Sequence, residues 1–241
     1  MAQVVAKADQ QKDDLCGPFC AARVLNVDQD LVAREAGTHL PAATEGPSVP
    51  SGARSRTDYR YELPKAPYAE SGTSPVGLIK AIESLSRGTL TSVPLRGEWT
   101  ADRVEALVDR APSLGARLIA NIRTGKLWGS HASAEELLAE LNGQATSGPP
   151  PDWDVGHFVE LTMLIRGPKA ALVVVHDTYP TLGLDGYHLQ PARAVAAALM
   201  RGDGREGGIL AVVSGDQADA VAAVGRELGL EVAAWDNGCR S

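Results

Sequence analysis

Aromatic residues and cysteines are scarce in this chain of 241 residues. Two Phe, five Tyr and four Trp leave a core that must be built mainly from aliphatic side chains. Three cysteines are too few for a disulfide scaffold, and their odd number leaves at least one free thiol. Acidic residues (30) outnumber lysine and arginine (23), and the net charge of -7 argues against a nucleic-acid-binding surface.

Membrane, targeting and metal signals are also missing. No apolar run approaches the ~18 residues that span a bilayer, and residues 1–14 lack the apolar stretch of a signal peptide. We therefore expect a soluble, cytoplasmic protein that contacts no membrane. The five histidines and three cysteines show no paired metal-ligand spacing, so neither a metal nor a cofactor is expected. Gly202, Gly204 and Gly207 have the spacing of a dinucleotide fingerprint, but a helical pattern precedes them and a strand pattern follows, which indicates a turn.

The periodicity of the apolar residues predicts an α+β fold in a single domain over 1–241, with 191–241 as a C-terminal extension of that domain. Two irregular, proline-containing segments, 38–74 and 143–156, are expected to be packed loops that act as lids. Helical patterns begin near Leu15, Asp28, Ser74, Thr100, Ser133, Pro191 and Asp216, and strand patterns cover 89–95, 116–122, 157–165, 170–177, 208–214 and 231–235.

Cys16 is the first candidate for chemistry. It stands at the start of a predicted helix, where the partial positive charge of the free backbone N–H groups stabilises a thiolate. Gly17, which follows it, would let a substrate backbone come close. Cys20 lies one turn further along the same face and is expected to be a packing residue, and Cys239 to be incidental. Taken alone, Cys16 fits a buried, inert thiol at least as well as a nucleophile.

His157 and Asp177 strengthen the catalytic interpretation. His157 follows Gly156 at the start of one predicted strand, and Asp177 ends the next. A hairpin with its turn centred between Gly167 and Pro168 pairs residue 157 with residue 178, which brings Asp177 beside His157. A carboxylate in that position orients a catalytic imidazole. The structural alternatives are a core histidine and an aspartate that caps the following turn.

Two more residues complete the candidate site. Gln10 lies six residues before Cys16, where its carboxamide could donate to an oxyanion beside the Cys16 backbone N–H. Gln11, the next residue, is the alternative candidate for this oxyanion donor. Trp153 precedes the histidine in a loop and is either a wall of the cleft or an ordinary loop anchor. With Gly17 and Gly156, it is a candidate for substrate binding.

The order of Gln10, Cys16, His157 and Asp177 along the chain resembles that of the papain-like cysteine peptidases. It is most similar to that of the double-glycine leader peptidases of bacteriocin export systems and their standalone relatives. The matching stretches are Gln10-x5-Cys16-Gly17, Gly72-Thr73-Ser74-Pro75, Gly156-His157-Phe158-Val159 and Val174-Val175-His176-Asp177. The resemblance spans 10–180 in outline. It implies that a helical part carrying the cysteine packs against an antiparallel sheet carrying the histidine and aspartate. Thr178 and Tyr179 precede Pro180, whereas these relatives usually have proline directly after the aspartate.

Three functions remain open at the level of sequence. The first is a cysteine peptidase or amidase with a Cys16-His157-Asp177 triad, acting on a peptide in natural-product maturation. The second is a papain-like acyltransferase or amide-forming enzyme, in which an amine replaces water as the acceptor. The third is a catalytically inactive peptide-binding module. The partner is therefore expected to be a peptide or an acyl or amide donor, and the oligomeric state is left open.

Overall fold

The computed structural model describes residues 10–43, 49–144 and 146–240. Residues 1–9, which carry most of the signal-peptide argument, lie outside the described residues. The helices are α1 (Cys16–Leu25), α2 (Gln29–Glu35), α3 (Pro75–Leu85), α4 (Ala101–Arg110), α5 (Ala134–Leu141), α6 (Ala192–Met200) and α7 (Ala218–Glu227). The strands are β1 (Leu40–Pro41), β2 (Lys65–Ala66), β3 (Leu90–Arg96), β4 (Arg117–Arg123), β5 (Gly156–Arg166), β6 (Ala171–His176), β7 (Tyr187–Pro191), β8 (Gly208–Ser214) and β9 (Glu231–Val232).

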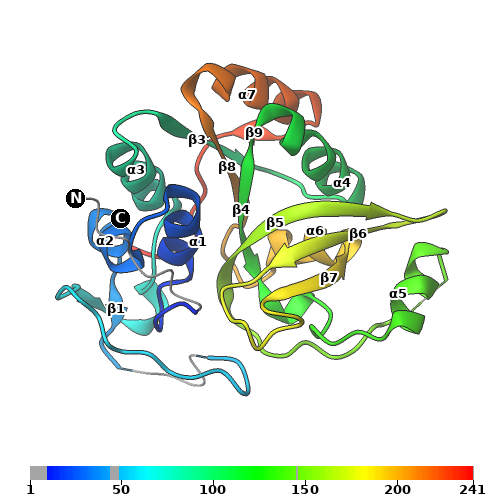
Figure 1. The fold of residues 1–241 in the computed structure, drawn as a ribbon, viewed down its shortest axis with the longest axis horizontal. Coiled ribbons are helices and arrows are strands. Elements are labelled where there is room, and N and C mark those ends of the chain that lie inside the picture. Colours follow the sequence, from blue (N-terminus) through cyan, green and yellow to red (C-terminus); the bar gives the residue numbers. More distant parts are fainter. Residues whose placement is uncertain (1–9, 44–48, 145, 241) are drawn as a thin grey trace.

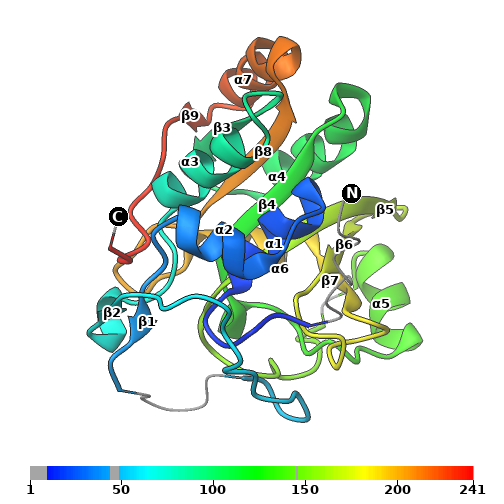
Figure 2. The same ribbon diagram turned by 60° about the vertical axis from the view of Figure 1, so that its left-hand side comes forward.

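The predicted α+β class is confirmed. Seven strands form one antiparallel sheet in the order β7-β6-β5-β4-β8-β3-β9, with helices around it (Figure 1). The short parallel pair β1–β2 stands apart from this sheet (Figure 2). β8 pairs with both β4 and β3, so residues from the C-terminal part of the chain lie in the middle of the sheet. None of the helices in the described part of the chain has the length and apolar character that a bilayer crossing requires.

Both faces of the sheet are covered, which explains why the central strands β4 and β8 are apolar almost throughout rather than alternating. Helices α1, α2 and α3 share one aliphatic core with Phe158 of β5. Helices α4, α6 and α7 share a second core with Val159 and Leu161 of the same strand. Successive residues of β5 therefore serve opposite layers, as the period of a strand requires.

Local signals in the sequence account for several helix starts. Ser133 and Glu136 form the expected capping box at α5, and the side chain of Ser74 accepts from the Gly77 N–H ahead of Pro75 in α3. Strand β7 lies within a stretch for which the sequence predicts no strand, because Gly183, Gly186 and Pro191 interrupt any alternating pattern there.

The β5–β6 hairpin forms with a different register from the predicted one. Gly167 donates its backbone N–H to Ala170 O (2.8 Å), so the turn is centred between Pro168 and Lys169, one residue later than expected, and Arg166 faces Ala171. A β-bulge between Leu161 and Met163 then shifts the pairing back by one residue. The pairing of residue 157 with residue 178 is therefore wrong, yet Asp177 still follows the end of β6 closely enough to meet His157.

Candidate active site

Cys16 is the first residue of α1, and its helix packs directly on β5. A Cβ atom on Gly17 would lie 3.1 Å from the ring of Phe158, so glycine allows this close approach. Cys20 is fully buried one turn further on, and its thiol donates to the Phe158 carbonyl oxygen (3.5 Å). Cys16 thus stands at the end of α1 where the free backbone N–H groups carry a partial positive charge.

His157 and Asp177 form a buried pair beside Cys16. The Nε2 atom of His157 lies 3.1 Å from Oδ1 of Asp177, and each residue is 1% exposed. The same Oδ1 accepts from the backbone N–H groups of Thr178 (2.6 Å) and Tyr179 (3.2 Å). Three donors thus hold the carboxylate, and it in turn fixes the plane and tautomer of the imidazole.

The charges of the pair stabilise each other. Burial by itself would lower the pKa of His157, but the charge and hydrogen bond of Asp177, with a smaller contribution from Cys16, raise it to about 10. Burial would raise the pKa of Asp177, yet the facing His157 holds it well below its usual range. Cys16 and His157 line the same cavity, and Cys16 is close enough to contribute to the raised pKa of the imidazole.

Two aromatic rings hold the imidazole in place. Trp153 meets it edge-on, with ring centroids 5.1 Å apart, and Tyr179 stacks on it at 6.1 Å with an interplanar angle of 19°. The two aromatic rings also touch each other at 5.5 Å. Trp153 is a cavity wall as well, since it lines the same hollow as Cys16.

The structure separates the two candidate glutamines. Gln11, not Gln10, lines the cavity with Cys16. Its backbone N–H donates to Thr178 O (3.1 Å), and its Oε1 accepts from the Thr178 hydroxyl (2.5 Å). The side chain of Gln10 instead donates to the backbone carbonyl of Arg54 and borders a second cavity of about 770 Å³.

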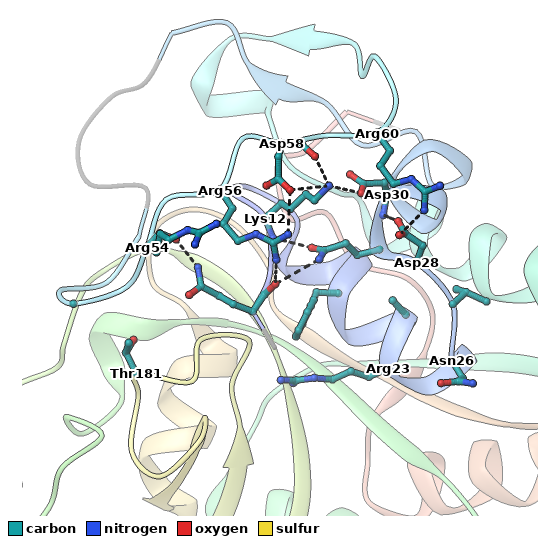
Figure 3. Close-up of a pocket in the computed structure, with 16 residues that line it drawn as sticks. Lys12, Arg23, Asn26, Asp28, Asp30, Arg54, Arg56, Asp58, Arg60 and Thr181 are labelled. Atoms are coloured by element: carbon teal, nitrogen blue, oxygen red, sulfur yellow. Dashed lines mark hydrogen bonds and ion pairs between the residues drawn. The ribbon is translucent and has the colours of Figure 1, made fainter. Parts of the chain in front are cut away.

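Lys12 explains this arrangement. Its ammonium group is buried between Asp30 and Asp58, at 2.6 Å from Asp30 Oδ2 (Figure 3). Because alternate residues of an extended segment point to opposite sides, burying Lys12 on the Asp30 side places Gln10 there too and turns Gln11 toward Cys16. The candidate Gln10 is thus not brought to Cys16, whereas its rival is.

The cavity beside Cys16 has a volume of about 220 Å³. Gly156 lines it, packed so closely that a Cβ atom would lie 2.8 Å from the guanidinium of Arg201, whereas Gly17 is buried against Phe158 and does not line it. Asp14 also borders the cavity, and burial, followed by the charge of Asp13, raises its pKa to about 6.

Cys239 also lines this cavity, so it is not the incidental residue that the sequence suggests. Its Sγ donates to Ser71 O at 2.9 Å, and burial, with the nearby Cys16, raises the pKa of Cys239 to about 12. No signal in the sequence links residue 239 to residue 16, because the approach depends on how the chain end packs on 71–73. Among the residues that the structure describes, no group of three His, Cys, Asp or Glu is placed to hold a metal ion.

Comparison with known proteins assigns the chain to a family. The family of unknown function DUF6885 matches residues 1–236, and the chain belongs to it. A search of curated proteins and a search of solved structures each gave no match.

Proposed function

We propose that this protein is a thiol-dependent acyl-transfer enzyme of the papain-like type, acting on a peptide or another amide. The observation that carries the proposal is the buried imidazole of His157, which bonds the carboxylate of Asp177 and lines the same cavity as Cys16, the first residue of a helix. A thiol and an imidazole that line one cavity, with a carboxylate bonded to the imidazole, are the groups that nucleophilic catalysis by cysteine requires.

In the first half of the reaction, His157 takes the proton of Cys16 Sγ, and the thiolate attacks the substrate carbonyl carbon. The backbone N–H of Cys16 and the side-chain amide of Gln11 stabilise the tetrahedral oxyanion. Collapse of this intermediate breaks the C–N bond, the imidazolium of His157 protonates the leaving amine, and a thioester remains on Cys16. Asp177 keeps the imidazole oriented throughout.

In the second half, His157 removes a proton from the incoming nucleophile, which attacks the thioester and regenerates the thiol. Attack by water makes the protein a peptidase or amidase, and attack by an amine makes it an acyltransferase. Which of these nucleophiles succeeds depends on how well the closed cleft excludes water.

Acylation by p-nitrophenyl acetate, followed by intact-mass and peptide mass spectrometry, tests the proposal. We expect one acetyl group on Cys16 in the wild type, none there in Cys16→Ser, and much slower acetylation in His157→Ala. A chase in buffer alone or with a primary amine then reveals the acceptor. If Cys16 is acetylated equally fast in His157→Ala and in the wild type, the proposal is wrong.

A further inference from the structure

A second histidine, His188, lies on the far side of Asp177. It is the second residue of β7, which pairs with β6 so that His188 faces Val175, two residues before Asp177. Its Nε2 atom lies 3.8 Å from Oδ2 of Asp177, while His157 occupies Oδ1 on the other side. The buried carboxylate is therefore placed between two imidazoles.

The hydrogen bonds of Gln190 fix which nitrogen of His188 carries the proton. The backbone N–H of Trp128 donates to Oε1 of Gln190 (2.8 Å), so that oxygen is the acceptor end of the amide. The Nε2 of Gln190 then donates to Trp128 O (2.8 Å) and lies 2.9 Å from Nδ1 of His188. Because an amide nitrogen can only donate, Nδ1 must accept, and the proton of the neutral ring is on Nε2.

The remaining surroundings of His188 also constrain its ring. The NH2 group of Gln190 faces Nδ1 of His188 at 2.9 Å and cannot accept a hydrogen bond from it. Gly183 packs so tightly that a Cβ atom there would lie 2.8 Å from Cβ of His188. The titratable group that faces His188 within the described residues is Asp177, with His157 beyond it.

The N–H of His188 is buried and has no hydrogen-bond partner among the described residues, although it points toward Asp177. An unmade bond of this kind is costly, and closing the gap to Oδ2 would satisfy both atoms. The need for that bond is greatest when His157 has given its proton to the leaving group. At that moment Asp177 keeps its charge but loses the cation that compensated it.

We propose that His188, with its tautomer set by Gln190, is a positioning residue that donates to Asp177 and holds this carboxylate ionised and oriented toward His157. The inference rests on the proposed function, because it assigns the triad a further member. It also explains why Gln190 is fully buried, with both the oxygen and the nitrogen of its side-chain amide hydrogen-bonded to the backbone of Trp128.

The test follows the rate at which iodoacetamide alkylates Cys16 between about pH 5 and about pH 9, with each cysteine read by peptide mass spectrometry. Buried Cys20 and high-pKa Cys239 serve as internal controls, since both should stay unlabelled in a folded protein over this range. A thiol paired with an imidazolium reacts below the pH at which a free thiol does. This readout requires no knowledge of the substrate.

In His188→Leu, we expect iodoacetamide to alkylate Cys16 about 10-fold to 100-fold more slowly than in the wild type at the acidic end of the range. Loss of a hydrogen bond to a charged group predicts an effect of this size. His188→Gln, whose amide can still donate to Asp177, should stay within about threefold of the wild type. His176→Leu is the matched control: this ring stacks on Tyr187 at 3.9 Å, and its exchange should leave the rate unchanged.

Asp177→Asn separates the two levels of the argument. If it and the wild type show the same pH profile, the proposed function fails. Thermal unfolding shows whether His188→Leu is folded. If Asp177→Asn slows the alkylation of Cys16 but a folded His188→Leu does not, only the role of His188 fails. Should the leucine variant not fold, the imidazole ¹⁵N spectrum of the wild type decides instead: a proton on Nδ1 of His188 overturns the inference, and a proton on Nε2 supports it.

Discussion

Exchanging Gln11 and Gln10 in turn for glutamate tests the proposed role of Gln11 in stabilising the oxyanion. Glutamate has the shape of glutamine and retains an oxygen that can accept from the Thr178 hydroxyl, as Gln11 Oε1 does now. It lacks the NH2 group. The Nε2 of Gln11 donates one hydrogen to Lys12 O (3.1 Å), and the second is available to an oxyanion in the cavity.

The size of the effect follows from these contacts. Loss of one oxyanion donor typically reduces kcat by about 100-fold to 1,000-fold, or roughly 2.7 to 4 kcal/mol. Gln11→Glu should reach at least the lower limit, since its carboxylate would also repel the oxyanion. Gln10→Glu should remain within about threefold of the wild type, because residue 10 lies away from Cys16 and beside Arg56, whose guanidinium accommodates a negative charge.

The assay is the rate of acetylation of Cys16 by p-nitrophenyl acetate, with thermal unfolding as a check on each variant. Gln11→Ala supplies a neutral second variant, since a carboxylate at the buried residue 11 could destabilise the fold. A large loss in Gln10→Glu together with a small loss in both Gln11 variants would refute the reasoning. It would mean that residues 10–12 turn over when substrate binds.

Three further outcomes follow from the buried charges and close contacts. His157 has a folded pKa of about 10, above its ordinary value of about 6.5, so its charge contributes stability below about pH 6.5 that is lost as the pH rises through about 10. Urea denaturation should therefore show the wild type exceeding His157→Gln by a few kcal/mol at neutral pH and by much less at about pH 10.5. Lys12→Met should cost about 3 to 5 kcal/mol by stranding Asp30, and adding Asp30→Asn should restore part of it, measured in the same way. Gly156→Ala should lower the thermal midpoint and cost about 1 to 3 kcal/mol, because its Cβ displaces the buried guanidinium of Arg201.

The sequence predicts the meeting of His157 and Asp177 because a hairpin constrains it. The strands are adjacent in the chain, and a turn of a few residues leaves little freedom in their pairing. The predicted turn at Gly167 and Pro168 lies one residue too early, and the bulge near Met163 compensates for part of the error. A bulge has no reliable signal in sequence, so the sequence does not predict the register itself.

Other features of the site depend on packing that periodicity does not reveal. Whether residue 10 or residue 11 reaches Cys16 is decided by the burial of Lys12 beside Asp30, a contact between distant segments. The sequence does not predict that His188 lies near Asp177, because the strand that carries His188 lies at the edge of the sheet and follows a glycine-containing loop. Cys239 reaches the cavity only because the chain returns to residues 71–73 after the last strand.

Thr178 stands at the position where the proposed papain-like type usually has proline. Its N–H donates to Asp177, its hydroxyl donates to Gln11, and its carbonyl accepts from Gln11. Proline at this position would retain only the carbonyl, because it has neither an N–H nor a hydroxyl. The segment that leads into Cys16 and the loop that holds Asp177 would then be joined by one hydrogen bond where there are now two, and the carboxylate would lose a donor. In this chain, threonine after the aspartate therefore ties the position of the thiol to that of the carboxylate.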